Sequence, residues 1–329
     1  MTGATPRADL VRTLVEQAVR APSSHNTQPW IFRRAADGAV ELRADRSRAL
    51  RVNDPDEREL FISCGAALLN FRVAARHHGL AAAVDLLPDP ADDALCARVI
   101  LSEARAAGPE DGGAGDDELL YTAIARRHTY RKPFADRPVP EATRHRMRQA
   151  VEREGARLAL VPDGMREHVA VLVGEGDRRQ FADRAWRREL AFWMRPPARG
   201  DGLTVPTPAA PVVRTVVRSL NLGARVAARD AALLRAAPLV AVIASRTDER
   251  PDWLATGQAW QRALLVLAAD GVLAAYANQP CQAGEPLRAR LARALPDRSG
   301  HPQLLFRAGY PRGGVRPSPR RPVDDVLIR

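Results

Sequence analysis

The segment 21–30 concentrates side chains that can bind the edge of a flat polar ligand. It contains two carboxamides, Asn26 and Gln28, and each offers both a hydrogen-bond donor and an acceptor. The candidate binding residues of this segment are Pro22, Ser23, Ser24, Asn26 and Gln28. Prolines near both ends restrict the loop, so little ordering cost falls on a ligand. The alternative is a polar turn that only links a helix to a strand.

A second segment, 126–134, is rich in cations. Five basic or potentially basic side chains fall within seven residues, and Thr129 adds a hydroxyl. Arginine guanidinium groups bind phosphate through two parallel hydrogen bonds, so the segment predicts an anion site. The candidate binding residues here are Arg127, His128, Thr129 and Arg131. Taken alone, the segment is equally compatible with a solvated basic turn between domains.

A third basic feature, Arg320 and Arg321, lies between prolines in the tail and follows a candidate buried strand at 304–308. A rigid arginine pair at this place is able to reach the same phosphate as the second segment. Taken alone, such a pair is typical of a basic tail.

Hydrophobic periodicity predicts the elements that must position these segments. Helices are expected at 9–21, 119–127 and 141–151, and strands at 30–32, 40–42, 98–101, 157–161, 238–245 and 304–308. Asp37-Gly38 is typical of a hairpin turn, and 107–117 of a linker. A long helix is expected from Asp54 to Gly79, about 24 residues or about 36 Å, with Asp54 as its cap, Pro55 in its first turn and Glu57 closing a capping box.

An internal repeat organises the chain. Gly65, Ala67 and Gly79 recur as Gly257, Ala259 and Gly271, an offset of 192 residues. The pattern predicts two tandem homologous halves, 1–118 and 119–329, that form a pseudo-dimer around two central long helices. The fold class is α+β with mixed β-sheets. Chance similarity of two alanine-rich helices is the alternative. Residues 195–237 have no counterpart in the first half and predict either a lid-like insertion or a surface helix with a loose loop.

Composition narrows the class of protein. The 329 residues are 46% hydrophobic and 27% charged, which is typical of a globular protein. The formal charge is +11, but arginine is scattered and not interleaved with aromatic residues, so a main role in nucleic-acid binding is disfavoured. Apolar runs are too short for a membrane span and no secretory signal is evident, so we expect a cytoplasmic protein. The three cysteines form no C-x-x-C pair, and no metal site is expected.

Together these features resemble the nitroreductase family of FMN proteins, and in particular its Acg-like branch of fused, monomeric, actinobacterial members. The resemblance is carried by residues 22–30, 126–131, 253–254, 257–259, 302–305, 309–310 and 320–322. It is weakest over 1–9, 86–117 and 195–237. At two positions, Tyr130 and Lys132, this chain has other residues than the asparagine and arginine that the branch often shows.

The resemblance implies one FMN at the interface between the halves. Arg127, Thr129 and Arg131 would hold the phosphate and the pyrimidine edge, and Arg321 would join on the phosphate, with Arg320 beside it as a further candidate. The loop 22–28 would come from the opposite half, and Pro280 to Gln282 would pass near the flavin N5. The serine- and asparagine-bearing loop occurs only in the first half and the arginine-rich turn only in the second. The sequence therefore predicts one complete site and an empty twin.

The implied function is an NADH- or NADPH-dependent two-electron reduction of a small nitroaromatic or quinone-like acceptor. The cofactor would do the chemistry, so no catalytic residue is assigned. A cation such as Arg127 or Arg131 would stabilise negative charge near the flavin. The main alternative is a flavin-storage protein that holds FMN under the 195–237 insertion with little reductase activity. A basic nucleic-acid binder is a third hypothesis.

Overall fold

The computed structural model describes residues 8–104, 114–296 and 300–328. Its helices are α1 (Ala8–Ala18), α2 (Arg58–His77), α3 (Ala114–Arg126), α4 (Glu141–Arg153), α5 (Asp163–Ala182), α6 (Arg184–Trp193), α7 (Ala210–Ser219), α8 (Gly223–Arg235), α9 (Arg250–Ala269), α10 (Gln279–Gln282) and α11 (Glu285–Ala294). Its strands are β1 (Trp30–Arg34), β2 (Val40–Ala44), β3 (Leu80–Leu86), β4 (Leu95–Glu103), β5 (Arg157–Leu160), β6 (Met194–Arg195), β7 (Leu203–Thr204), β8 (Leu239–Ser245), β9 (Leu273–Tyr276), β10 (His301–Gly309) and β11 (Leu327–Ile328). Of the expected linker 107–117, residues 107–113 lie outside the described residues, and residues 114–117 belong to the first turn of α3.

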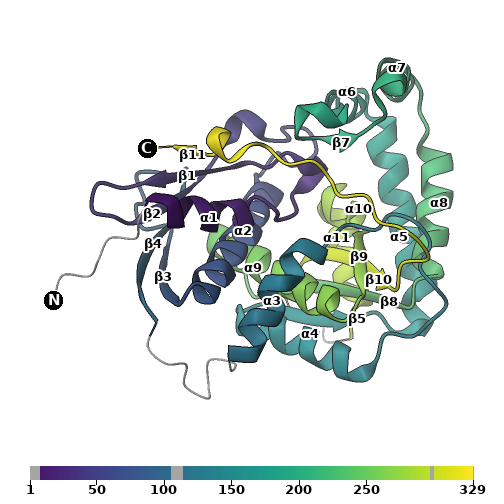
Figure 1. The fold of residues 1–329 in the computed structure, drawn as a ribbon. Coiled ribbons are helices and arrows are strands. Elements are labelled where there is room, and N and C mark those ends of the chain that lie inside the picture. Colours follow the sequence, from purple (N-terminus) through teal and green to yellow (C-terminus); the bar gives the residue numbers. More distant parts are fainter. Residues whose placement is uncertain (1–7, 105–113, 297–299, 329) are drawn as a thin grey trace.

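Two larger sheets and two central helices make up the fold. The first sheet has the strand order β11-β1-β2-β4-β3 and the second has the order β5-β8-β10-β9. Helix α2 packs on the first sheet, α9 packs on the second, and the two helices pack on each other (Figure 1). The predicted α+β class with a mixed sheet is confirmed. Only the first sheet is mixed, however, because β11 runs parallel to β1 while every pairing between the named strands of the second sheet is antiparallel.

The strand order confirms the predicted pseudo-dimer. In the first sheet β1, β2, β4 and β3 are successive neighbours, and β5, β8, β10 and β9 take the same places in the second. Both bounds of α9 lie 192 residues after the matching bounds of α2. The two helices also end alike, since Gly79 and Gly271 follow them at φ 74° and 72°, a conformation that glycine adopts without steric cost.

The predicted glycine repeat lies where the two central helices cross. A Cβ atom at Gly65 would overlap the carbonyl oxygen of Leu254, and one at Gly257 would overlap that of Ile62. Leu254 and Ile62 are each three residues before the glycine of their own helix, so the two contacts are related by the same 192-residue offset. The crossing therefore has a local pseudo-two-fold symmetry, and it requires glycine at both positions.

The first turn of α2 differs from the expectation. The helix begins at Arg58 and has 20 residues, shorter than the expected span from Asp54 to Gly79. Glu57 adopts φ 61° and pairs with Arg46 and so closes no capping box. Asp54 nevertheless caps the helix, because its carboxylate accepts hydrogen bonds from the backbone N–H groups of Glu59 and Leu60. The prediction of the cap was right, and the prediction of the helical span was wrong.

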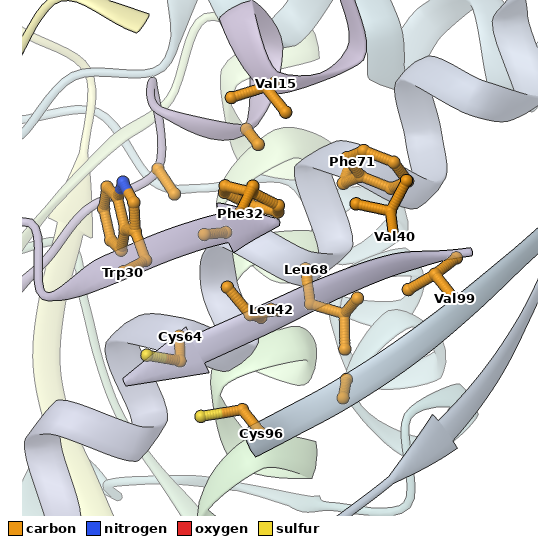
Figure 2. Close-up of a cluster of buried hydrophobic side chains, with 14 of the residues drawn as sticks. Val15, Trp30, Phe32, Val40, Leu42, Cys64, Leu68, Phe71, Cys96 and Val99 are labelled. Atoms are coloured by element: carbon orange, nitrogen blue, oxygen red, sulfur yellow. The ribbon is translucent and has the colours of Figure 1, made fainter. Parts of the chain in front are cut away.

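The core of the first half lies between its sheet, α1 and α2. Figure 2 shows Phe32 and Phe71 stacked there, with ring centroids 5.7 Å apart. Cys64 and Cys96 are fully buried in the same cluster and form no disulfide. The expected Asp37-Gly38 turn is confirmed, because it joins β1 and β2, and Gly38 has φ 86°. Within the described residues, no helix combines the length and hydropathy needed to cross a membrane.

The two halves differ most between their first two strands. A short hairpin joins β1 to β2, but 161–238 separate β5 from β8, and we call this segment the excursion. It contains the expected insertion 195–237 but begins earlier, with α5. Helix α5 packs against α8, and α6 packs against α7 (Figure 1). The second part of the expected insertion forms two helices, α7 and α8, where a single surface helix was one of the two expectations.

The chain after β10 crosses back to the first half. Residues 310–326, which we call the C-terminal arm, lead from the second sheet to β11, which pairs with β1 (Figure 1). The segment that follows α3 joins the second sheet, because Thr129 bridges to Ala274 of β9. The expected boundary at 118/119 falls within α3, so the division into units 1–118 and 119–329 stays a proposal.

We predict that Gly65→Ala and Gly257→Ala each lower the free energy of unfolding by about 3 kcal/mol, because the added methyl groups overlap backbone that has no room to move. The control is Gly164→Ala in α5, where a Cβ atom meets no neighbour within 4 Å. That change should leave stability the same or raise it by up to about 1 kcal/mol. Urea unfolding measures all three variants, and equal stability of Gly65→Ala and wild type would contradict the crossing.

Candidate functional site

A cavity of about 390 Å³ lies between the two halves, and the three basic or polar segments singled out from the sequence meet at its wall. Of the predicted site residues, those that line it are Pro22, Ser23, Ser24, Asn26, Arg127, His128, Thr129, Arg131, Gln282 and Arg320. Those that do not line it are Gln28, Pro280 and Arg321. The structure therefore brings most of the predicted set into one place, from elements up to 298 positions apart in the sequence.

The loop after α1 is shaped by three residues with positive φ. His25, Asn26 and Gln28 have φ 48°, 55° and 52°, values that are uncommon for residues other than glycine. The Oγ of Ser23 holds the turn by accepting a hydrogen bond from the Gln28 backbone at 2.9 Å. Such a concentration of unusual backbone is typical of binding loops that the surrounding structure holds in place.

The two carboxamides of this loop bind protein groups. Asn26 donates to the carbonyl oxygens of Gly202 and Pro319, and its own oxygen accepts a hydrogen bond from Arg320. Gln28 is fully buried, donates to the carbonyl oxygen of Gly200 at 2.8 Å and accepts from the backbone of Arg321. Both side chains thus fasten the excursion and the C-terminal arm to the loop, and Gln28 has no contact with the cavity.

The arginine-rich turn leaves α3 and enters the cavity wall. Its backbone is fixed by the hydrogen bond from Tyr130 to the Ala274 carbonyl oxygen at 3.0 Å. Arg127 is buried and donates to the carbonyl oxygen of Arg20, while its Nε has no partner. Tyr130 packs against Phe134, away from the cavity lining, so this departure from the branch pattern leaves the cavity wall unchanged.

The C-terminal arm contributes Arg320 to the cavity. Arg320 donates to Asn26 and to the carbonyl oxygens of Arg20 and Ala21, and its Nε has no partner. Arg321 points to the other side of the arm, where its guanidinium donates to the carbonyl oxygens of Gln28 and Asp325. Of the predicted pair, Arg320 lines the cavity and Arg321 does not.

Three arginines, Arg127, Arg131 and Arg320, give this part of the cavity wall its positive charge, and we call them, together with the neighbouring His128, the cation cluster. Within the described parts of the chain, none of the three arginines forms an ion pair with an acidic residue. Burial, together with the neighbouring cations, lowers the pKa of Arg127 to about 10, that of Arg320 to about 9 and that of His128 to about 4. At neutral pH the arginines are charged and His128 is neutral. Such a cluster is stabilised by an anion.

Glu59, which we did not predict, joins the polar parts of the cavity wall. It is 3% exposed, and it accepts hydrogen bonds from Ser24 at 2.5 Å, from Asn278 at 2.5 Å and from Gln282 at 2.8 Å. Its position at the start of α2 therefore connects the first half to the α10 region of the second. The sequence shows Glu59 only as an acidic residue directly before a long apolar run. Many acidic residues at such positions only stabilise the start of a helix, so this pattern does not identify a site residue.

No second site of this composition lies at the matching position in the other half. The loop after α1 corresponds to residues 154–156 between α4 and β5, which contain no serine or asparagine. Glu154 is ion-paired there with Arg72 and Arg262, both at 2.7 Å or less. A buried carboxylate with two arginines thus lies where the first half has its candidate binding loop.

Comparison with known proteins finds relatives that align over nearly the whole chain. No family model matches. A protein of Mycobacterium tuberculosis strain H37Rv named "Putative NAD(P)H nitroreductase" is 30% identical over 98% of this chain and 92% of its own length. The acg protein of the same strain has the same description and is 29% identical over 97% of this chain and 95% of its own length.

Solved structures give partial superpositions. A nitroreductase with bound FMN from Desulfitobacterium hafniense matches with a TM-score of 0.40 and 14% identity, over 64% of this chain and 97% of that one. A variant of the FMN- and NADPH-dependent nitroreductase NfnB from a Sphingopyxis strain matches with a TM-score of 0.42 and 21% identity, over 64% and 98%.

We predict that Glu59→Ala lowers the free energy of unfolding by about 3 kcal/mol, because it leaves the donors of Ser24, Asn278 and Gln282 without their acceptor. Glu16→Ala is the control, since Glu16 is half-exposed and makes only a surface pair with Arg12. Its effect should stay within about 0.5 kcal/mol. Chemical denaturation measures both, and a small, equal loss in the two variants would contradict the connecting role of Glu59.

Proposed function

Because this chain belongs to the nitroreductase family, we propose that it binds one FMN in the cavity between its halves and uses NADH or NADPH to reduce small nitroaromatic or quinone-like acceptors. The observation that carries this proposal is the cation cluster, which faces the cavity and, within the described residues, forms no ion pair with an acidic side chain. We further propose that the protein acts as a cytoplasmic monomer, since one chain supplies both halves of the cavity wall.

The residues at the cavity wall fit the phosphate of FMN. A dianion there would offset the mutual repulsion of Arg127, Arg131 and Arg320, and it would accept hydrogen bonds from guanidinium groups. The Nε atoms of Arg127 and Arg320 are buried donors without partners, which costs free energy in the absence of an acceptor. We therefore assign Arg127, Arg131 and Arg320 to the phosphate and Thr129 to a polar edge of the same ligand.

When bound, FMN would supply the two-electron carrier that the reaction needs. The protein contributes the surroundings. Arg131, at the solvent-exposed side of the turn, favours the addition of negative charge in the cavity. Apolar side chains, among them Phe181, Leu190 and Leu203, line the same cavity and exclude water from a flat acceptor.

A flavin-storage protein is the second candidate, and the attachment of the excursion favours it. Asp201 is buried and binds Arg48 and Arg195, the latter at 2.8 Å. The backbone N–H of Gly202 donates to the carbonyl oxygen of Asn26 at 3.1 Å. These contacts hold residues of the 195–237 insertion against the binding loop, and Leu203 and Leu233 enter the cavity lining. A cofactor under this segment would be shielded from an electron donor.

We predict that the protein binds FMN more tightly than riboflavin, because riboflavin lacks the phosphate. Arg127→Ala and Arg131→Ala should each weaken FMN binding by about 10- to 100-fold, the loss expected for a charge-assisted hydrogen bond of about 1.5–3 kcal/mol. Both should leave riboflavin binding nearly unchanged.

Quenching of flavin fluorescence measures these affinities. The matched control is Arg126→Ala, because Arg126 is the exposed neighbour of Arg127 and does not line the cavity. Thermal unfolding identifies a variant that fails to fold. If Arg127→Ala does not fold, the comparison of FMN with riboflavin in Arg131→Ala, a change at an exposed position, tests the phosphate site. Equal affinity of the wild-type protein for FMN and riboflavin would remove the arginines from the proposed site.

For a reductase, we predict that anaerobic NADPH or NADH bleaches the visible absorbance of the FMN-loaded protein within seconds. A storage protein should bleach with dithionite but only slowly with either nucleotide. Asp201→Asn tests the cause of such slowness, because it removes the charge that holds the excursion through Arg48 and Arg195. Faster bleaching in this variant would place the barrier in the excursion, and prompt bleaching of the wild type would exclude storage as the main role.

A further inference from the structure

A second polar group lines the same cavity and has the opposite character to the cation cluster. It consists of Asp177 on α5, Asp230 on α8 and Gln279 on α10, and we call it the acceptor cluster. Two of its three members belong to the excursion, which the first half lacks. None of them lies in the three segments that predict the FMN site.

Hydrogen bonding within the acceptor cluster leaves two acceptors without partners. The Nε2 of Gln279 donates to Oδ1 of Asp177 at 3.1 Å and to Oδ2 of Asp230 at 3.2 Å. The remaining Oδ2 of Asp177 and Oε1 of Gln279 are buried and unpaired. Asp177 is only 2% exposed, so solvent reaches it poorly. An unpaired buried acceptor costs about 1–3 kcal/mol, and more when it is charged, and a ligand with N–H donors would offset that cost.

The backbone brings the acceptor cluster together at a glycine. A Cβ atom at Gly176 would lie 2.7 Å from the Cβ of Gln279 and 2.9 Å from its carbonyl carbon. Helix α5 therefore approaches α10 closely only because residue 176 is glycine, and this approach lets Asp177 reach Gln279. The arrangement is built into the packing of the two helices.

The acceptor cluster contains two carboxyl groups and no basic side chain. Among the described residues, neither Asp177 nor Asp230 forms an ion pair with a basic side chain, although Arg178, Arg229 and Arg307 act on them from a longer distance. Burial, and next the charge of Asp230, raises the pKa of Asp177 to about 7. Burial also raises the pKa of Asp230. Both carboxyl groups therefore hold a proton more readily than a free aspartic acid does.

The same helix faces present apolar side chains beside the carboxylates. On α8, Val226, Asp230 and Leu233 line the cavity at spacings of four and three residues, which is one face of a helix. On α5, Asp177 and Phe181 are likewise one turn apart and both line it. A ligand that meets the acceptors with a cationic group therefore meets apolar carbon with its remaining surface.

We propose that the acceptor cluster is a subsite for a planar amidinium-type cation carried on an aromatic ring, and that acceptors of this class are the substrates favoured by the cavity. Two N–H donors of such a group would satisfy Asp177 Oδ2 and Gln279 Oε1, while its charge is attracted by the carboxylates. The substrate assignment rests on the proposed function, but the binding of the cation does not require the flavin.

The test is calorimetric titration of the purified full-length protein with benzamidine, with benzamide and benzoate as neutral and anionic analogues of the same size. Benzamidine should bind at least tenfold more tightly than either analogue. Asp177→Asn and Asp230→Asn should each weaken benzamidine binding by at least tenfold. Asp163→Asn, on the same helix but with a 93% exposed side chain, should not change it.

Thermal unfolding accompanies each variant. Since Asp177→Asn removes a buried unpaired charge, its melting temperature should be unchanged or raised. If its melting temperature is lowered instead, Asp230→Asn is used to test benzamidine binding. No benzamidine binding, equal affinity for benzamidine and benzamide, or an unaffected Asp177→Asn variant would overturn the subsite. Benzamidine selectivity in a protein that binds no FMN would preserve the subsite and refute the proposed function, and FMN binding without this selectivity would do the reverse.

Discussion

The backbone contact between α2 and α9 is the constraint on which the rest of this structure depends. Two glycines allow the helices to approach until each touches a carbonyl group of the other. This closeness sets the distance between the two sheets and fixes where α2 begins relative to the second half. Glu59, in the first turn of α2, can therefore reach Asn278 and Gln282. A wider crossing would separate the two parts of the cavity wall.

The cavity is electrostatically divided. Arginines from two crossing segments, the turn after α3 and the C-terminal arm, make one part of its wall positive. Another part of the wall contains the carboxyl groups of Asp177 on α5 and Asp230 on α8, and the buried Glu59 is fully occupied by hydrogen bonds from polar neighbours. Because burial weakens screening by water, both charged groups act strongly on anything inside. Such a cavity selects ligands by the arrangement of their charges as well as by their shape.

The sequence predicted the parts of this structure that follow from local pattern. The glycine offset identified both central helices, and the polar and basic segments supplied ten of the residues that line the cavity. Other features depend on tertiary context. In the extended arm neighbouring side chains alternate in direction. The sequence favoured Arg321 for the phosphate, but only the structure shows that Arg320 lines the cavity and Arg321 does not. Asp177 and Asp230 resemble the solvated face of an amphipathic helix, and only the packing of α5 on α8 shows that they face a cavity. The expected start of α2 was wrong because a left-handed residue, Glu57, interrupts the turn that Asp54 caps.

The C-terminal arm also affects the order in which the protein matures. During synthesis, folding starts with the N-terminal portion of a chain. The sheet edge at β1 nevertheless stays open, and the carboxamides of Asn26 and Gln28 stay without their arm partners, until residues 319–328 emerge. The first half is thus translated before the second, but its contacts are complete only when the C-terminal arm has been added. A nascent chain would therefore have a candidate binding loop whose geometry becomes fixed only after the C-terminal arm has been synthesised and has packed on the first half.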